Sequence, residues 1–238
     1  PTTYVLLESS MNHRVTTLAF ALLLSAPFVA QAEEESPIAW EVTGVSDYVF
    51  RGASQTDEKP TLQGDFSYTT SAGLYAGVWA SGVDFGDEKP DLELNPYIGW
   101  NTDLSETVNF DAMLVRYVYP DAGSNNYNEL VTTTTFAETY SATVAYSNNV
   151  WNTDTDGWYL AVGGEWALPQ EFSLNAGVGY NTFKEDVAED YVDWTVGVSR
   201  AFGPATVGLA YVGTNSRGEY NFGETADDRV VLSVTFGN

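Results

Sequence analysis

The spacing of turns and loops constrains the fold of this chain more than any other feature. Runs of alternating apolar residues, each about 10 residues long, are ended by turn residues. The segments that join them alternate between short turns and longer loops. We predict strands over 38–50, 61–70, 74–83, 92–101, 107–119, 127–137, 140–149, 158–168, 172–183, 191–202, 205–214 and 229–236. This rhythm predicts an all-β fold, a transmembrane antiparallel up-and-down β-barrel of about 12 strands, with ten or fourteen as alternatives. The short turns would face the periplasm and the longer loops the outside.

A secretory signal precedes the first predicted strand. Met11 is followed by charged residues, then by an apolar run over 18–29 and by Ala30-Gln31-Ala32. This order of n-region, h-region and cleavage site predicts a signal peptide over 11–32. Residues 1–10 are interpreted as a translated leader or as residues added in cloning. The barrel is then expected over 33–238, in the bacterial outer membrane.

The predicted strands have one apolar face and one small or polar face. In 158–168, Trp158, Leu160 and Val162 alternate with Ala161 and Gly163. A soluble barrel would place the apolar face inside, and its outer face would normally carry Lys and Glu. The polar face here is rich in Gly, Ser, Thr and Asn, as a lumen would be. Aromatic residues at the strand ends are expected to form two interfacial girdles, although ordinary sheet packing would also use them.

Two segments depart from this pattern. Arg116 falls on the otherwise apolar face of its strand, which predicts a bulge or an early strand end there. In 74–83, Tyr75 and Trp79 compete with Leu74 and Val78 for the lipid face.

The composition argues against an enzyme. Cysteine is absent, and the only histidine is His13, within the predicted signal. The usual Ser-His and Cys-His arrangements of acyl transfer are therefore not available. Acidic clusters at 84–88 and 154–157 have oxygen ligands of the kind calcium uses, but neither fits the twelve-residue calcium loop. We expect these clusters to be solvated, and we predict no metal and no cofactor.

The acidic balance of the chain predicts which solutes it attracts. The formal net charge is -24, a field that repels nucleic acid and attracts cations. The strand alternation points a set of charged side chains inward, and an acid-biased pore would favour cations. The candidates for the lumen are Glu41, Asp47, Arg51, Asp65, Glu93, Asp111, Glu165, Asp193 and Arg229. Asp47 and Arg51 are expected near the outer mouth. The rival expectation is a closed lumen in which these groups pair, Asp47 and Arg51 sharing one face of a strand.

A stretch of motifs near the N-terminus resembles a known bacterial family. The motifs are the run 46–52 (Ser-Asp-Tyr-Val-Phe-Arg-Gly), Ser54-Gln55-Thr56, and 73–81 (Gly-Leu-Tyr-Ala-Gly-Val-Trp-Ala-Ser) followed by Val83-Asp84-Phe85. They resemble the TorF-like family of outer-membrane porins, also catalogued as the Gcw-chp domain of unknown function. The resemblance is dense over residues 40–100. It implies a secreted outer-membrane barrel with porin activity and offers no substrate.

One departure concerns assembly. Barrel proteins usually end on an aromatic residue that the barrel-assembly machinery reads, whereas Gly237 and Asn238 follow Phe236 here.

These observations predict a passive channel for small hydrophilic solutes that leans toward cations. The alternative is a non-conducting structural or adhesive barrel whose acidic loops bind cations. A weaker third interpretation is a soluble periplasmic barrel that binds a ligand. The expected partners are outer-membrane lipid and lipopolysaccharide, the barrel-assembly machinery, and small solutes or cations, but not nucleic acid.

Overall fold

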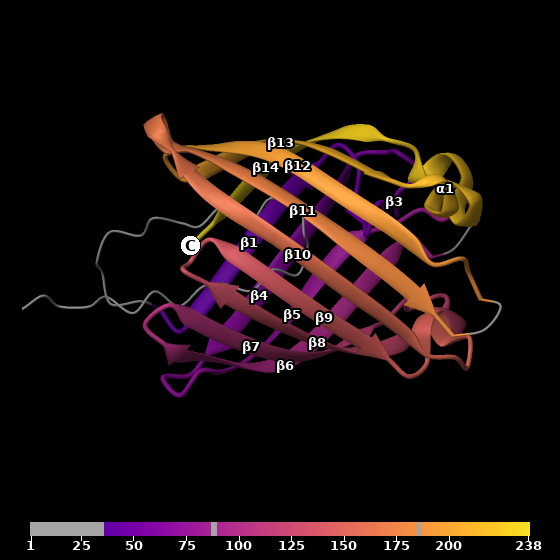
Figure 1. Cartoon of the computed structure of the whole chain (residues 1–238), viewed down its shortest axis with the longest axis horizontal. Coiled ribbons are helices and arrows are strands. Elements are labelled where there is room, and N and C mark those ends of the chain that lie inside the picture. Colours follow the sequence, from indigo (N-terminus) through magenta and orange to yellow (C-terminus); the bar gives the residue numbers. More distant parts are fainter. Residues whose placement is uncertain (1–35, 87–89, 185–186) are drawn as a thin grey trace, which may run out of the picture.

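The wall of the molecule is one closed antiparallel barrel in which β14 pairs with β1 (Figure 1). The computed structural model describes residues 36–86, 90–184 and 187–238. The wall strands are β1 (Ile38–Val45), β4 (Thr61–Thr69), β5 (Leu74–Gly82), β6 (Leu92–Ser105), β7 (Val108–Tyr117), β8 (Tyr127–Phe136), β9 (Tyr140–Ser147), β10 (Gly157–Leu168), β11 (Phe172–Phe183), β12 (Tyr191–Phe202), β13 (Ala205–Thr214) and β14 (Arg229–Gly237). The predicted twelve-stranded up-and-down barrel is therefore confirmed. The predicted leader (1–10) and signal peptide (11–32) lie outside the described residues.

The remaining elements lie in the connections. Two short strands, β2 (Val49–Phe50) and β3 (Ala53–Ser54), form a separate hairpin between β1 and β4. The helical segments are η1 (Gly123–Asn125), η2 (Val150–Asn152), η3 (Pro169–Glu171), α1 (Ser216–Phe222) and η4 (Gly223–Ala226). Helix α1 begins in what the sequence predicted as a loop, where the side chain of Asn215 accepts a hydrogen bond from the Gly218 N–H. In the described part of the chain, no helix has the length and apolar character needed to cross a bilayer.

The barrel closes where its first and last strands meet. In the register of β1 and β14, Val42 lies opposite Phe236 and Thr43 opposite Thr235. The Thr43 and Thr235 hydroxyl oxygens lie 2.9 Å apart, and the Trp40 N–H donates to Asn238 Oδ1 at 2.9 Å. Closure leaves neither strand with an unpaired edge, which is the condition for a sheet to survive in lipid.

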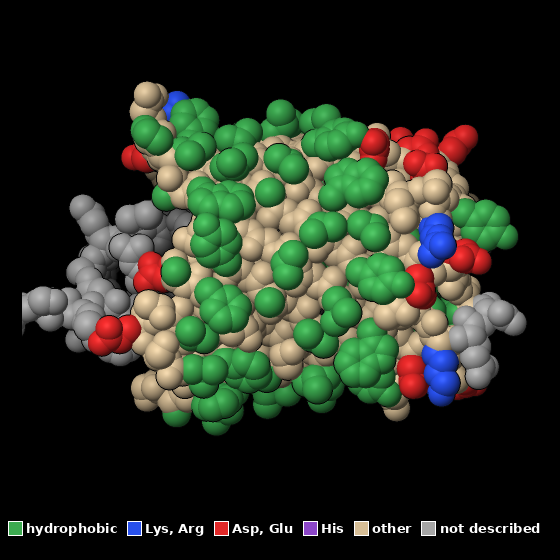
Figure 2. Space-filling model, viewed as in Figure 1, with side chains coloured by type: hydrophobic (Ala, Val, Ile, Leu, Met, Phe, Trp, Pro, Cys, Tyr) green, Lys and Arg blue, Asp and Glu red, His purple; other side chains and the backbone are tan. Residues whose placement is uncertain are grey.

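The outer surface of the barrel is an apolar belt. Leu62, Val162 and Val230 are exposed to 70%, 58% and 60%, and the hydrophobic side chains cover the middle of the barrel in Figure 2. Acidic and basic side chains gather at the end that carries the long loops. Aromatic pairs mark both rims of the belt, with Tyr146 and Trp158 near the loops and Tyr140 and Trp166 near the short turns. Apolar side chains on the outside and polar ones on the inside are the arrangement of a barrel in a bilayer, opposite to that of a barrel in water.

The structure resolves the two irregular segments. Pairing in β7 is regular through Arg116, which lies opposite Asn128, and β7 ends one residue later, so a strand end rather than a bulge explains Arg116. A register shift occurs in β6 instead, between Asp103 and Ser105. In β5, Leu74 and Val78 face outward, whereas Tyr75 and Trp79 are buried inside.

The predicted first strand, 38–50, was wrong at its C-terminal end. β1 ends at Val45, and the chain from Ser46 onward leaves the wall. The apolar alternation continues to Phe50 because the next residues also bury apolar side chains, but they do so inside the barrel. A strand in the wall and a strand in the lumen have the same period, so the sequence pattern could not separate them.

An arginine placed in the belt should destabilise the barrel in a depth-dependent way. Val162→Arg, near the middle of β10, should lower the free energy of unfolding from bilayers by about 2–4 kcal/mol, and Val230→Arg, at the loop rim, by about 0–1 kcal/mol. Chemical unfolding from lipid vesicles measures both, with Val162→Leu as the control. Equal small effects at both positions would contradict a membrane-facing belt.

Candidate functional site

The segment after β1 folds into the lumen instead of outward. We call residues 46–56 the inward hairpin. Its strands β2 and β3 pair Val49 with Ser54 and Phe50 with Ala53. Tyr48, Val49 and Ala53 are buried, and the Tyr48 ring meets Trp79 of the wall edge-on at 5.3 Å. The hairpin folds inward because its apolar side chains find partners only on the lumen face of the wall.

A buried ion pair holds the base of the hairpin. One Asp47 carboxylate oxygen accepts hydrogen bonds from Ser54 Oγ at 2.6 Å and Thr56 Oγ1 at 2.8 Å. The other oxygen accepts from the Arg229 guanidinium at 2.9 Å. Arg229 also donates to the backbone oxygens of Glu224 and Asp227. The base of the hairpin is thereby connected to the loop between β13 and β14.

A second ion pair holds the tip of the hairpin against the opposite wall. Arg51 Nη2 lies 2.8 Å from Glu129 Oε2, and both side chains are largely buried. The guanidinium lies 4.2 Å from the centre of the Tyr159 ring and 4.7 Å from that of Phe50. The Tyr191 hydroxyl donates to the Arg51 carbonyl oxygen at 3.1 Å. The tip therefore contacts β8, β10 and β12, so the hairpin crosses the lumen.

Glycine is required at the tip for two reasons. Gly52 has a φ of +84°, in the left-handed region that side chains rarely adopt. A Cβ there would overlap Thr214 Cγ2 and come within 2.9 Å of the Gly213 oxygen and 3.0 Å of Asp193 Cβ. The tip can press against the wall only because it has no side chain at this position.

The lumen carboxylates are held by neutral donors. The Tyr97 hydroxyl donates to Asp65 at 2.9 Å, that of Tyr75 to Asp111 at 3.1 Å, and that of Tyr159 to Asp193 at 3.2 Å. Asn181 donates to Asp193, and Asn95 donates to Glu93 at 2.7 Å. Hydroxyl and amide donors satisfy the carboxylate lone pairs without cancelling the charge, so the lumen keeps an acidic character.

The structure places the predicted lumen residues in two groups. Near the loop end lie Asp47, Arg51, Glu93, Asp193 and Arg229, and nearer the short turns lie Glu41, Asp65, Asp111 and Glu165. Glu41 and Asp65 face each other in the register of β1 and β4.

The expectation that Asp47 and Arg51 share a face of one strand was wrong. Asp47 follows the end of β1, and Arg51 lies at the hairpin tip, so they pair separately with Arg229 and Glu129. Glu129 was not among the lumen residues predicted from the sequence. Its strand alternates Asn128 and Leu130 outward with Glu129 and Val131 inward, so the period of two could have found it.

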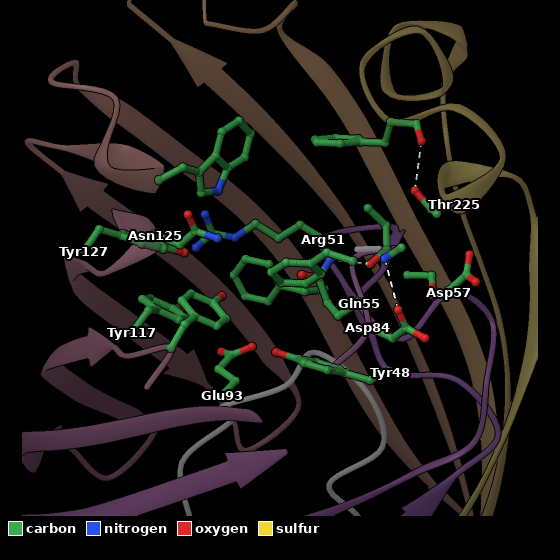
Figure 3. Close-up of a pocket in the computed structure, with 18 of the residues that line it drawn as sticks. Tyr48, Arg51, Gln55, Asp57, Asp84, Glu93, Tyr117, Asn125, Tyr127 and Thr225 are labelled. Carbon is green, nitrogen blue, oxygen red and sulfur yellow. Dashed lines mark hydrogen bonds between the residues drawn. The ribbon is translucent and has the colours of Figure 1, made fainter. Parts of the chain in front are cut away.

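A cavity of about 490 Å³ lies above the hairpin, at the loop end; we call it the vestibule. Figure 3 shows Arg51, Tyr48 and Glu93 around it, with Asp57 and Asp84 on the side of the acidic loops. The described residues contain no group of three or more acidic or histidine side chains that could hold a metal ion.

The fold and the polar lumen define an outer-membrane type of β-barrel. The chain belongs to a bacterial protein family of unknown function, Gcw_chp, whose profile matches residues 30–236. The resemblance seen in the sequence is thus confirmed. No curated protein matches the chain.

Solved structures share the fold at low sequence identity. The KdgM porin superposes with a TM-score of 0.55 and 7% identity over 83% of this chain and 98% of its own. The NanC porin gives 0.55 and 8% over 83% and 97%. KdgM in complex with disordered oligogalacturonate gives 0.55 and 7% over 84% and 97%. Identities this low show a common fold and no more.

Gly52→Ala should release the hairpin tip. Overpacking in a filled interior costs about 1–3 kcal/mol, so the population of the open form should rise by about five- to 150-fold. Tryptic cleavage after Arg51, which is protected in the closed form, should accelerate accordingly. Gly86→Ala is the matched control, because Gly86 has the same φ of +84° and a Cβ added there would meet nothing within 4 Å. Equal cleavage in both variants would show that close packing at Gly52 does not hold the tip.

Asp47→Asn should loosen the base of the hairpin. Removing one partner of a buried ion pair costs about 3–5 kcal/mol when the other charge is left uncompensated. Arg229 would keep Glu58, whose Oε1 lies 3.5 Å from its Nη1, so we expect a cost at the low end of this range. Hydrogen exchange of the Gln55 N–H, which donates to the Tyr48 oxygen, should quicken by at least roughly tenfold. Asp57→Asn, at an exposed carboxylate a few residues further along, serves as the control and should leave that exchange unchanged. Unaltered exchange in Asp47→Asn would mean that the pair with Arg229 does not hold the hairpin.

Proposed function

We propose that this protein is an outer-membrane channel for small hydrophilic solutes, cation-leaning and narrowed at its outer end by the inward hairpin. The observation that carries the proposal is the ion pair of Arg51 with Glu129, which fixes the hairpin tip across an otherwise acidic lumen. The apolar belt, its aromatic rims and the fold shared with porins support the location.

The acidity of the lumen supports the preference for cations. Glu41, Asp65, Asp111 and Glu165 lie below the hairpin, and the described hydrogen bonds to Asp65 and Asp111 come from neutral groups. A pore lined by carboxylates attracts cations and repels anions. At the hairpin the two arginines are matched by Asp47 and Glu129, so they do not reverse this sign.

A non-conducting barrel is the second candidate, and one observation favours it. The layer around the hairpin is densely filled: Glu93 is 1% exposed, and Glu129 and Tyr159 are each 2% exposed. A hairpin that never moves would leave a structural or adhesive barrel whose acidic loops bind cations. The two candidates differ in whether the hairpin moves and opens the lumen. Conductance distinguishes them, because only an open lumen passes ions.

Arg51→Gln should widen the channel. Glu129 would keep its burial but lose its cation, so the closed position of the tip should weaken by about 3–5 kcal/mol. In planar bilayers under a salt gradient, we expect the native protein to show small cation-selective steps and Arg51→Gln to show larger or more frequent ones. Arg116→Gln is the matched control, since Arg116 lies at the same end but on the outer face.

Inserted native protein and Arg51→Gln that both stay silent would overturn the channel and leave the non-conducting barrel. An anion-selective reversal potential would overturn the cation preference alone.

A further inference from the structure

The vestibule has an aromatic lining that a passage for water and salt does not need. Nine of its nineteen lining residues are aromatic. Phe222, at the end of α1, meets Trp151 edge-on at 5.9 Å and Tyr191 at 5.4 Å. Elsewhere in the lining, the Phe85 ring meets the Tyr119 ring edge-on at 5.6 Å. Rings from separate connections thus form the walls of one box.

Four of the nine rings are partly exposed, whereas the five tyrosines of the lining, Tyr48, Tyr117, Tyr119, Tyr127 and Tyr191, are buried. Phe85 is 39% exposed, and Phe50, Trp151 and Phe222 are half-buried. About 490 Å³ is within the range of pockets that hold small ligands. The box therefore has both the space and the accessible ring surface to take a guest.

The charges around the box are acidic in balance. Its lining carries the carboxylates of Asp57, Asp84 and Glu93 and one cation, Arg51. Arg51 is matched by Glu129, and Lys59 bridges Asp57 at 3.0 Å and Asp84 at 2.8 Å. With these partners counted, carboxylates still exceed cations.

We propose that the vestibule binds small organic cations that carry an alkylated ammonium group. The negative faces of aromatic rings attract a cation, and the attraction is greatest for a weakly hydrated one that can shed its water. A small metal ion would keep its hydration shell, and an anion would meet the surplus of carboxylates. That the vestibule binds such cations does not depend on the proposed channel function. That they are the transported solute rests on that proposed function.

The ligand pair that tests the charge is choline and 3,3-dimethylbutan-1-ol, its neutral isostere. Isothermal titration calorimetry on the full folded chain in a maltoside detergent would measure both; a phosphocholine detergent would carry the probe's own headgroup. We expect choline to bind about tenfold more tightly than the isostere, as cation–π contacts of this kind imply. Equal binding of both, or binding of neither, would overturn the proposal.

The variant pair that tests the site lies on one helix. Phe222→Leu should weaken choline binding about three- to tenfold by removing a ring from the box. Tyr220→Leu is the matched control, because Tyr220 is 81% exposed and does not line the cavity. Trp151→Leu provides a second test from a different loop. The site would be overturned if Phe222→Leu and Tyr220→Leu lost choline affinity equally. It would also be overturned if neither Phe222→Leu nor Trp151→Leu lost choline affinity, because binding would then lie elsewhere.

Failure of this proposal and failure of the channel are separable. Calorimetry needs no conductance, so a silent barrel can still bind choline. A conducting barrel that binds neither ligand would keep the channel and refute the vestibule as an organic-cation site. The heat-modifiable mobility of each variant on a gel checks that its barrel is folded before binding is compared.

Discussion

Closure of the sheet between β1 and β14 is the constraint on which the rest of the molecule depends. A strand in lipid cannot leave its backbone groups unpaired, and the registers of Val42 with Phe236 and Thr43 with Thr235 remove the last free edges. Once the sheet is closed, its apolar face must point outward and its polar face inward. The interior is then a place where carboxylates, amides and hydroxyls have to satisfy one another.

The inward hairpin exploits that polar interior. A guanidinium buried in a membrane barrel needs an opposite charge and ring faces to replace water, and Arg51 finds both in Glu129 and Tyr159. The base of the hairpin follows the same rule through Asp47 and Arg229. Two ion pairs at opposite ends of one short segment make the hairpin a defined part of the lumen. Its position narrows the outer end of the barrel, so the channel function that we propose depends on a few buried charges.

Much of the fold could be predicted because each strand of a membrane barrel alternates apolar and small or polar side chains with a period of two residues. The alternation of apolar and small residues predicted where the strands lie. The alternation of short turns and long loops predicted their up-and-down order and a number of about twelve. The same period predicted Asp65, Asp111 and Asp193 on the lumen side; in the structure Asp111 and Asp193 are buried, and Asp65 accepts a hydrogen bond from Tyr97. The contacts of the hairpin could not be found in this way, because a strand that lines the wall and one that fills the lumen have the same pattern. Phe50 continued the alternation and was assigned to the wall for that reason.

The sequence by itself determined a closed, acidic barrel of about twelve strands, since strand period and turn spacing depend on residues close together in the chain and net charge depends on composition alone. Only the tertiary structure decided that residues 46–56 turn inward, that Arg51 reaches Glu129, and that rings from separate loops enclose one vestibule. These are contacts between residues far apart in the chain. They depend on the curvature of the wall, which brings β8, β10 and β12 opposite the hairpin, and no local pattern records that curvature.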